Sequence, residues 1–353
     1  MAVAARYVNR EMFAVFCVTL LLLLLVAVGG RFIGYLQEAA LGKFTGSAVL
    51  TIITLRLPEF IQLVAPFALY VAVLLTFGRL YAEQEMVVLQ SAGAGTSRLL
   101  SWSGITIGGV TLGVAVLSLY ATPLSQRMLV DFMAVERAQT EFETVNPGIF
   151  HAYDRGRRVT YSEAMSDDRR ILYNVFMSQR MEDGREALIW AEQGTQEVDA
   201  SGTRYLVLEQ GHRYERAPTG GDYRVVEFDQ LSQRLSTNER PSTHAVEAQS
   251  TFALGTDVKS RAEWHWRIAL PLFCIVGGML GLGVSRVKPR QGRFTRVVPG
   301  MLLMLLYYLS LLLFHNAINE ESMPAWIGLW PVHMAFAGFA CWQLWRLGKP
   351  VKA

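Results

Sequence analysis

Charged residues that interrupt long apolar stretches are the ones best placed to do chemistry in this sequence. Arg56 and Glu59 flank Pro58 in a mostly apolar region, and a spacing of three residues lets two side chains pair across one helical turn. Charge inside a bilayer is costly unless it is paired or hydrated. These residues therefore predict either an interfacial ion pair or, more specifically, a gate or a contact with a partner.

Two basic residues, Arg31 and Lys43, follow the first apolar stretch. Long basic side chains at a membrane rim commonly act as anchors, with their stems in lipid and their charges in water. They also suit phosphate groups, because charge-assisted hydrogen bonds to phosphate are strong. Arg31 and Lys43 are therefore expected either to anchor the chain or to contact an anionic lipid.

Residues 81–93 carry a helical pattern between two apolar stretches, and glycines at 93 and 95 would end that helix. Glu83 lies within this segment and would fit poorly against anionic headgroups, as would the glutamate two residues later. Docking of a cytoplasmic partner is therefore the better interpretation of this helix. The residues expected on one side of it are Tyr81, Glu85, Val88 and Leu89.

Patterns typical of catalytic and metal sites are missing from the sequence. It has no Gly-x-x-x-x-Gly-Lys-Ser/Thr loop for binding the phosphates of ATP and no Cys/His pairs at metal-ligand spacing. The histidines of the polar region are scattered, and all three cysteines lie in apolar stretches. We therefore predict no catalytic residue, no metal and no cofactor bound by this chain.

Elements long enough to cross a membrane must position these residues. The chain has 353 residues, of which 52% are apolar and 18% charged, and six stretches lack Asp, Glu, Lys and Arg. Nineteen helical residues reach about 28 Å, close to the roughly 30 Å hydrocarbon layer. This excludes a soluble globular chain, a disordered chain and a small disulfide-rich domain. The six stretches are Met12–Gly30, Phe60–Gly78, Leu99–Gln126, Ile268–Ser285, Val297–Asn319 and Ser322–Trp345.

The first stretch could instead be a cleaved signal peptide, since it has a basic start and an apolar run. It is longer than a typical signal-peptide core, and no Ala-x-Ala site closes it. A retained helix is therefore expected. The sequence thus predicts two groups of three membrane helices, within residues 1–121 and 268–353.

Residues 122–267 form a polar insertion with a net charge of −5, whereas the rest of the chain carries +8. Leu124–Glu143 has helical spacing and should extend the third span outward until Asn146-Pro147-Gly148 ends it. Short runs of two-residue period then alternate with turn residues, which predicts an all-β sandwich or rolled sheet. Its open edges could accept a strand from another chain.

Orientation follows from the basic residues near the helix ends, because Lys-rich and Arg-rich short loops stay in the cytoplasm. With the N-terminus inside, twelve Lys and Arg residues fall on the inner side, and five of them lie within 286–296. The short outer loops then hold little more than Lys43. We therefore expect both termini in the cytoplasm and residues 122–267 across the membrane.

Several short motifs, taken in order on this topology, resemble the LptF/LptG permease family of lipopolysaccharide exporters, and its LptF branch most. The resemblance covers essentially the whole chain. The motifs are Arg6-Tyr7 with Arg10-Glu11, Pro58-Glu59 with Pro66, the segment Leu80–Gly93, Asn146-Pro147-Gly148-Ile149-Phe150, Arg267-Ile268 and Lys288-Pro289-Arg290-Gln291-Gly292-Arg293.

The resemblance implies a permease subunit of an ABC transporter in the bacterial inner membrane. Such a chain pairs with an LptG-like permease and is driven by an LptB-like ATPase dimer, which uses the ATP. It takes lipopolysaccharide from the membrane into a cavity lined by spans one and five. A periplasmic β-jellyroll then passes the lipid to an LptC-like protein and a bridge toward the outer membrane.

Individual residues acquire roles through the same resemblance. The segment 81–93 would be the coupling helix seated in the ATPase, with Glu85 at the acidic contact position. Arg31 falls at a basic position near the cavity rim used toward lipid phosphates, whereas Lys43 has no clear match and is included by charge alone.

Two other classes of protein compete with this interpretation. A membrane-anchored enzyme would need a polar catalytic cluster in 122–267 or at the outer membrane face, and the sequence offers none. An assembly scaffold or receptor would explain the β domain but not a coupling-like helix between spans. No nucleic-acid partner is expected from any of the three.

Overall fold

The structure is a computed structural model of the 353-residue chain. It describes residues 2–40, 46–91, 93, 95–143, 147–153, 157–166, 171–180, 185–198, 204–216, 223–234, 246–286 and 296–347. Close contacts divide the chain into two compact units. One unit contains Met1–Gly34, Thr51–Leu129 and His244–Ala353, and the other contains Tyr35–Leu50 and Val130–Thr243. The domain boundaries drawn from the sequence at 121/122 and 267/268 remain predictions.

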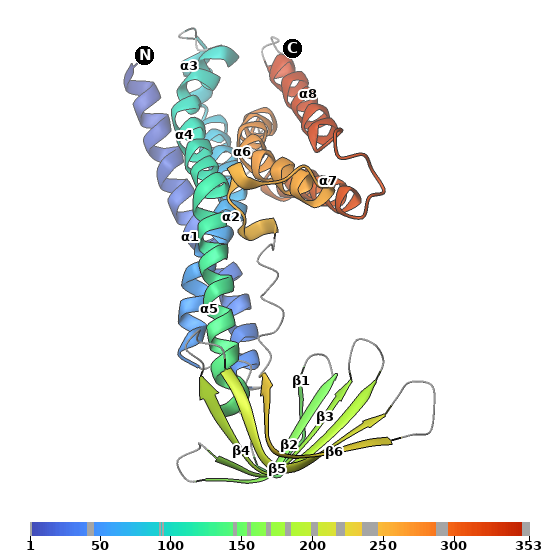
Figure 1. Cartoon of the computed structure of the whole chain (residues 1–353). Coiled ribbons are helices and arrows are strands. Elements are labelled where there is room, and N and C mark those ends of the chain that lie inside the picture. Colours follow the sequence, from blue (N-terminus) through green and yellow to red (C-terminus); the bar gives the residue numbers. More distant parts are fainter. Residues whose placement is uncertain are drawn as a thin grey trace. The chain divides into compact units, whose positions relative to one another are not determined.

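Helices occupy every apolar stretch singled out in the sequence (Figure 1). Within the described residues, five helical segments are long and apolar enough to cross a membrane: Val3–Ala40, Ala48–Ala82, Ser97–Met133, Val258–Val284 and Val297–Asn319. The sixth expected span is α8, whose 18 residues reach about 27 Å but include tryptophans, a proline and a glutamine. The predicted helical membrane fold is therefore confirmed. The helices are α1 (Ala2–Ala40), α2 (Ala48–Ala82), α3 (Glu85–Ser91), α4 (Thr96–Val116), α5 (Thr122–Glu143), α6 (Val258–Val284), α7 (Val297–Asn319) and α8 (Trp330–Leu347).

The centre of the helical unit is α6, which packs against α4, α7 and α8. Small residues let it approach its neighbours closely, as is usual between membrane helices. A Cβ at Gly281 would lie 3.0 Å from the side chain of Val73 in α2. Glycine at this position therefore sets the distance between two spans.

The third span changes its helical type near its middle. Between α4 and α5 the backbone forms the π-helix η1 (Leu117–Ala121), and the helix then continues through α5 to Glu143. The predicted continuation of this span as a helix to Glu143 is confirmed, whereas its outward direction stays a prediction. No pattern in the sequence predicted the π-turn, which leaves room for side chains from elsewhere to bond to the backbone.

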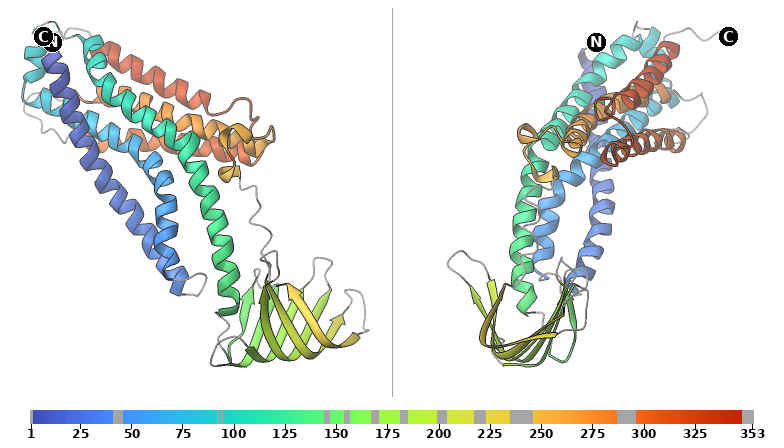
Figure 2. Two further views of the ribbon diagram at one scale, coloured as in Figure 1. Left: turned by 60° about the vertical axis from the view of Figure 1, so that its left-hand side comes forward. Right: turned by 45° about the vertical axis from the view of Figure 1, so that its right-hand side comes forward.

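The second unit contains six antiparallel strands in one sheet, with neighbours in chain order. The two-residue periodicity predicted strands in this insertion, and the inserted β-sheet is confirmed. Among the described strands the connectivity is a meander in one curved sheet, as in the expected rolled sheet (Figure 2), and no crossover of the jellyroll kind joins two sheets among them. The strands are β1 (His151–Tyr153), β2 (Arg158–Met165), β3 (Ile171–Arg180), β4 (Glu186–Val198), β5 (Arg204–Arg216) and β6 (Tyr223–Arg234).

A bend runs across β3, β4 and β5. Each of these strands has two consecutive exposed residues where alternation would put one, and the three interruptions are neighbours across the sheet. Asn174 and Gln210, at the bend, have φ of 48° and 51°. Because the bend reverses the side-chain alternation, apolar residues stay on one face on both sides of it. That face holds a core of Leu172, Val175, Met177, Ile189, Ala191, Leu206 and Leu208.

Candidate functional sites

The segment predicted as one helix over 81–93 is divided in the structure. The second span ends at Ala82, Gln84 takes a φ of 62°, and a separate seven-residue helix, α3, follows. The prediction of one continuous helix with Tyr81 and Glu85 on the same side is therefore wrong. The cause is the left-handed residue at 84, which a polar side chain tolerates better than a branched one.

The inner side of α3 is anchored in the core of the helical unit. Met86 is fully buried in the same apolar cluster as Phe77, and Leu89 packs against that cluster. The outer side is open, since Val87 and Val88 are 59% and 70% exposed. Apolar side chains held this rigidly on a surface are typical of a contact with another protein.

Gly93 lies just after α3. Its φ is 84°, a conformation that suits glycine, and its carbonyl accepts a hydrogen bond of 2.8 Å from the Arg98 side chain. The predicted stop at this glycine is confirmed. Arg98 thereby ties the end of the segment to the first turn of α4.

The N-terminal end of α1 is fastened to the end of α2. Arg79 pairs with Glu11 and donates to the Tyr7 hydroxyl, and its guanidinium lies 5.7 Å from the Tyr7 ring centre. Arg79 also lies 4.0 Å from Glu83. One arginine thus joins the start of the first span to the segment between α2 and α3.

The Arg56–Glu59 ion pair predicted from spacing is confirmed. An Arg56 nitrogen lies 3.1 Å from a Glu59 carboxylate oxygen, and the Gln126 amide donates to the same oxygen at 2.6 Å. One turn further along α2, Gln62 accepts a hydrogen bond from Thr122 at 2.9 Å. This polar cluster therefore joins the second span to the start of α5, on either side of Pro58.

A second polar site surrounds Arg267 in α6, whose side chain is only 2% exposed. Its guanidinium pairs with Glu263 at 2.7 Å and donates to Thr251 at 2.7 Å. It also donates to three backbone carbonyls, those of Val246, Glu247 and Gln249, at 3.0–3.3 Å. Arg267 therefore holds residues 246–251, which lead into α6, against that helix.

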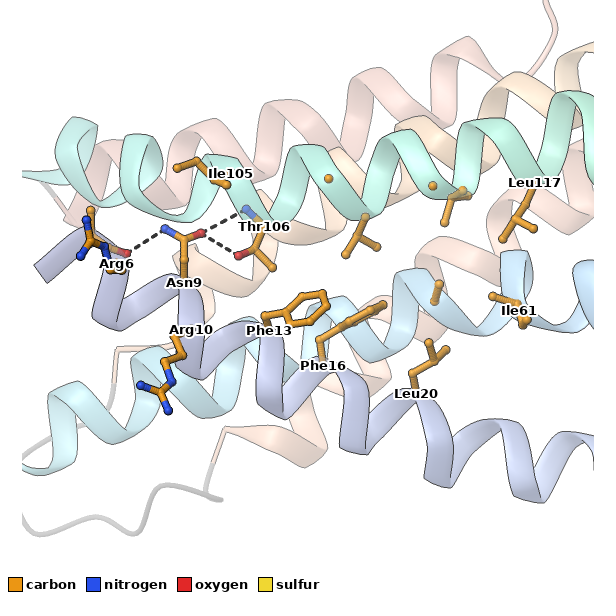
Figure 3. Close-up of a pocket in the computed structure, with 16 residues that line it drawn as sticks. Arg6, Asn9, Arg10, Phe13, Phe16, Leu20, Ile61, Ile105, Thr106 and Leu117 are labelled. Atoms are coloured by element: carbon orange, nitrogen blue, oxygen red, sulfur yellow. Dashed lines mark hydrogen bonds between the residues drawn. The ribbon is translucent and has the colours of Figure 1, made fainter. Parts of the chain in front are cut away.

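A groove of about 970 Å³ lies between α1, α2 and α4 (Figure 3). Its walls are mostly apolar, with Phe13, Phe16 and Leu20 along α1, and Arg6 and Arg10 both lie toward one end of it. The sequence assigned no role to individual residues of this groove, although the family resemblance implied that the first span lines a lipid cavity.

The Asn9 side chain bridges two of the helices that wall this groove. Its amide oxygen accepts from the backbone N–H and the hydroxyl of Thr106, at 3.1 and 2.6 Å, and its amide nitrogen donates to the Trp102 carbonyl. It therefore fixes α1 against the backbone of α4 within the apolar region.

Comparison with known proteins matches these features to one family. Residues 6–346 match the family described as lipopolysaccharide export system permease LptF/LptG. The chain belongs to this family. It is 26% identical over 341 residues to the lipopolysaccharide export system permease protein LptF of Escherichia coli K12, covering 95% of this chain and 92% of that protein. The LptF proteins of Escherichia coli O157:H7 and Shigella flexneri match to the same extent.

As a member of the LptF/LptG family, the chain is a multi-pass membrane subunit of a transporter and not itself an enzyme. The residues predicted to contact lipid are Arg31 and Lys43. Arg31 is exposed on α1, and Lys43 lies outside the described residues. Their contact with a lipid therefore stays a prediction.

The residues that sequence reasoning missed are polar side chains inside or beside spans. Arg267 stands directly before an uncharged stretch, and Asn9 stands three residues before another. A charged or amide side chain at such a place was a usable signal, because it must find partners. Which partners it finds depends on tertiary contacts that spacing does not reveal.

Proposed function

We propose that this permease takes lipopolysaccharide from the inner membrane of a bacterium and passes it toward the outer membrane, using ATP hydrolysed by a separate subunit. The observation that carries the proposal is the family match over residues 6–346, which includes both helical groups and the sheet. The cost of exposing acyl chains to water supports the need for a separate subunit that hydrolyses ATP. Each CH₂ exposed to water costs about 0.8 kcal/mol, so extracting a lipid with several acyl chains needs an external energy source.

The orientation we propose has both termini in the cytoplasm and the β domain in the periplasm, with domains at 1–121, 122–267 and 268–353. The excess of Lys and Arg in the segments that would then be inside supports it. Cysteine labelling in intact cells tests it. A cysteine at Glu209, which is exposed on β5, should react with an impermeant reagent only from the periplasmic side.

We propose that the ATPase, an LptB-like dimer, docks on α3. The exposed Val87 and Val88 beside Glu83 and the half-buried Glu85 support this, because they form a mixed apolar and acidic surface on an anchored helix. Glu85→Arg should lower the ATPase recovered with the permease several-fold. Glu320→Arg, an exposed acidic residue just after α7, is the matched control. Equal recovery in both variants would refute docking at α3.

An LptG-like second permease and an LptC-like protein complete the proposed assembly. The sheet has β1 and β6 at its two edges in the described residues, and an open edge is where a strand from another chain can add. The β domain would then pass lipid to the LptC-like protein through strand addition. Cysteine crosslinks between β6 and that protein, formed only in the assembled complex, are the expected result.

We propose that Arg31, with Lys43, contacts lipopolysaccharide phosphates. The exposure of Arg31 near the end of the first span supports this role. Arg31→Glu should lower lipopolysaccharide crosslinking and lipopolysaccharide-stimulated ATP hydrolysis, whereas Arg31→Lys should retain both. Wild-type crosslinking in Arg31→Glu would mean that this side chain is an anchor.

A further inference from the structure

The groove between α1, α2 and α4 differs from the lipopolysaccharide contacts proposed above, because it lies at the opposite end of α1 from Arg31. We infer that it binds one phospholipid with an anionic headgroup, whose phosphate sits at Arg6 and Arg10 and whose acyl chains follow α1. The inference depends only on the chain being a membrane permease. It does not depend on which side of the membrane the N-terminus faces.

Two arginines at one end of the groove make that end suitable for an anionic group. Arg6 and Arg10 are four residues apart on α1, so both can reach one phosphate. Both are exposed, and neither makes a hydrogen bond or ion pair with any residue in the described part of the chain. Arg79, close by, is instead satisfied by Glu11 and Tyr7. Two unneutralised guanidinium groups remain for an anionic ligand.

The groove is polar at one end and apolar along the rest of its length. The two arginines and Asn9 lie at one end, and beyond Asn9 the lining is apolar except for Thr106 (Figure 3). The oxygen and nitrogen of the Asn9 amide are already bonded to α4 and to α1 itself, so they do not require water. A charged end followed by an apolar channel matches an amphiphile better than a water-soluble anion.

The dimensions of the groove fit one phospholipid. Its lining runs along α1 from Ala5 to Leu20, a rise of about 22 Å. Half of a hydrocarbon layer of roughly 30 Å is about 15 Å, so this length covers one leaflet and its headgroup layer. A volume of about 970 Å³ suits a single ligand of moderate size. Lipopolysaccharide, with its several acyl chains, would need a larger space.

Two glycines of α4 keep the groove open. A Cβ at Gly109 or Gly113, both of which line it, would meet no atom within 4 Å. A larger side chain there would therefore enter the groove and not another helix. Gly108, next in the chain, also has open space around a built Cβ but does not line the groove. This pair offers a matched test.

The experiment uses the full chain, purified with its partner subunits in nanodiscs of equal parts phosphatidylglycerol and phosphatidylcholine. Native mass spectrometry counts the lipid retained as detergent removes the bulk. The wild type should retain one phosphatidylglycerol per permease, and Gly109→Leu should lose it whereas Gly108→Leu keeps it. Arg6→Gln/Arg10→Gln should lower the preference for phosphatidylglycerol about tenfold, and Arg6→Lys/Arg10→Lys should largely restore it.

Three results would overturn the inference. One is equal retention of phosphatidylglycerol by the wild type, Gly109→Leu and the double glutamine variant, each with an unchanged unfolding temperature. Another is retention of co-purified lipopolysaccharide at this groove in place of phospholipid. The third is a photo-crosslinker at Phe13 that captures a partner's protein chain, since the groove would then be a helix-docking surface. Loss of lipopolysaccharide transport in Arg31→Glu would affect none of these measurements.

Discussion

The buried guanidinium of Arg267 donates a hydrogen bond of 2.7 Å to the hydroxyl of Thr251, and that hydroxyl donates in turn to the Leu119 carbonyl at 2.6 Å. Ser118 completes the ring by donating to the backbone carbonyl of Arg267 at 2.9 Å. One arginine and two hydroxyls thus join α6, the segment before it and the π-turn of the third span. The π-turn therefore has a structural role, because it contributes the Leu119 carbonyl and the Ser118 hydroxyl to this ring.

We predict that Arg267→Ala lowers the free energy of unfolding by about 3–5 kcal/mol, because it leaves the carboxylate of Glu263 without its buried ion-pair partner. Arg267→Lys should be only partly tolerated, since an ammonium has three donors where the guanidinium has five. Thermal unfolding of the purified permease measures both. Arg261→Lys, an exposed arginine on the same helix, is the control and should melt like the wild type.

Much of the fold follows from the sequence because its causes are local. Uncharged stretches of membrane length and two-residue periodicity predicted the helices and strands, and the spacing of Arg56 and Glu59 predicted their ion pair. The break at Gln84 and the bend at Asn174 were not predicted, because each depends on a left-handed backbone residue without a glycine signal. The partners of Arg267 and Asn9 come from distant segments, which one sequence does not place together.

The two sides of α3 should respond differently to substitution. Met86→Ala removes a fully buried side chain and should destabilise the helical unit by about 2–5 kcal/mol. Val88→Asp alters a residue that is 70% exposed and should change stability by less than about 0.5 kcal/mol. If the ATPase docks here, Val88→Asp should nevertheless lower its recovery several-fold. Normal recovery in a stably folded Val88→Asp variant would place the contact elsewhere.

The start of α6 should be sensitive to acid. Asp257 caps this helix and accepts a hydrogen bond from the backbone N–H of Ser260 at 3.1 Å. Bonds from the side chain and then the backbone of Ser260 hold the pKa of Asp257 below its ordinary value. Because this pKa is lowered in the folded state, the cap contributes stability above the unfolded-state pKa and loses it as the pH falls through the folded-state pKa.

Unfolding temperatures on either side of about pH 4 therefore test the cap. Asp257→Asn keeps an acceptor at the cap and should flatten the acid dependence, whereas Asp257→Ala should lower the unfolding temperature at neutral pH. An identical acid dependence in the wild type and Asp257→Asn would assign it to other carboxylates.

The sheet has no room for a side chain at Gly211. A Cβ there would lie 2.2 Å from the Trp190 carbonyl oxygen and 2.6 Å from the Phe228 ring. Gly211→Ala should therefore push two neighbouring strands apart and cost about 1–3 kcal/mol. Faster proteolysis of the β domain would report this, with Glu209→Ala on the exposed side of the bend as the control. Equal cleavage rates would show that the strands can move apart freely.

The last two spans are joined by a hydrogen bond of 2.5 Å between the Tyr307 hydroxyl and Nδ1 of His333, both buried. Nε2 of His333 has no partner among the described residues, so this bond satisfies the ring only in part. Tyr307→Phe should lower the free energy of unfolding by about 0.6–1.7 kcal/mol, which is between the mean and the maximum measured for such bonds between membrane helices. Adding His333→Leu should recover most of that loss, because replacing both residues leaves no buried polar group without a hydrogen-bond partner. Tyr308→Phe, on the same helix, is the control and should leave the unfolding temperature unchanged. A similar loss of stability in Tyr307→Phe, Tyr307→Phe/His333→Leu and Tyr308→Phe would mean that ring packing, and not the hydrogen bond, holds α7 to α8.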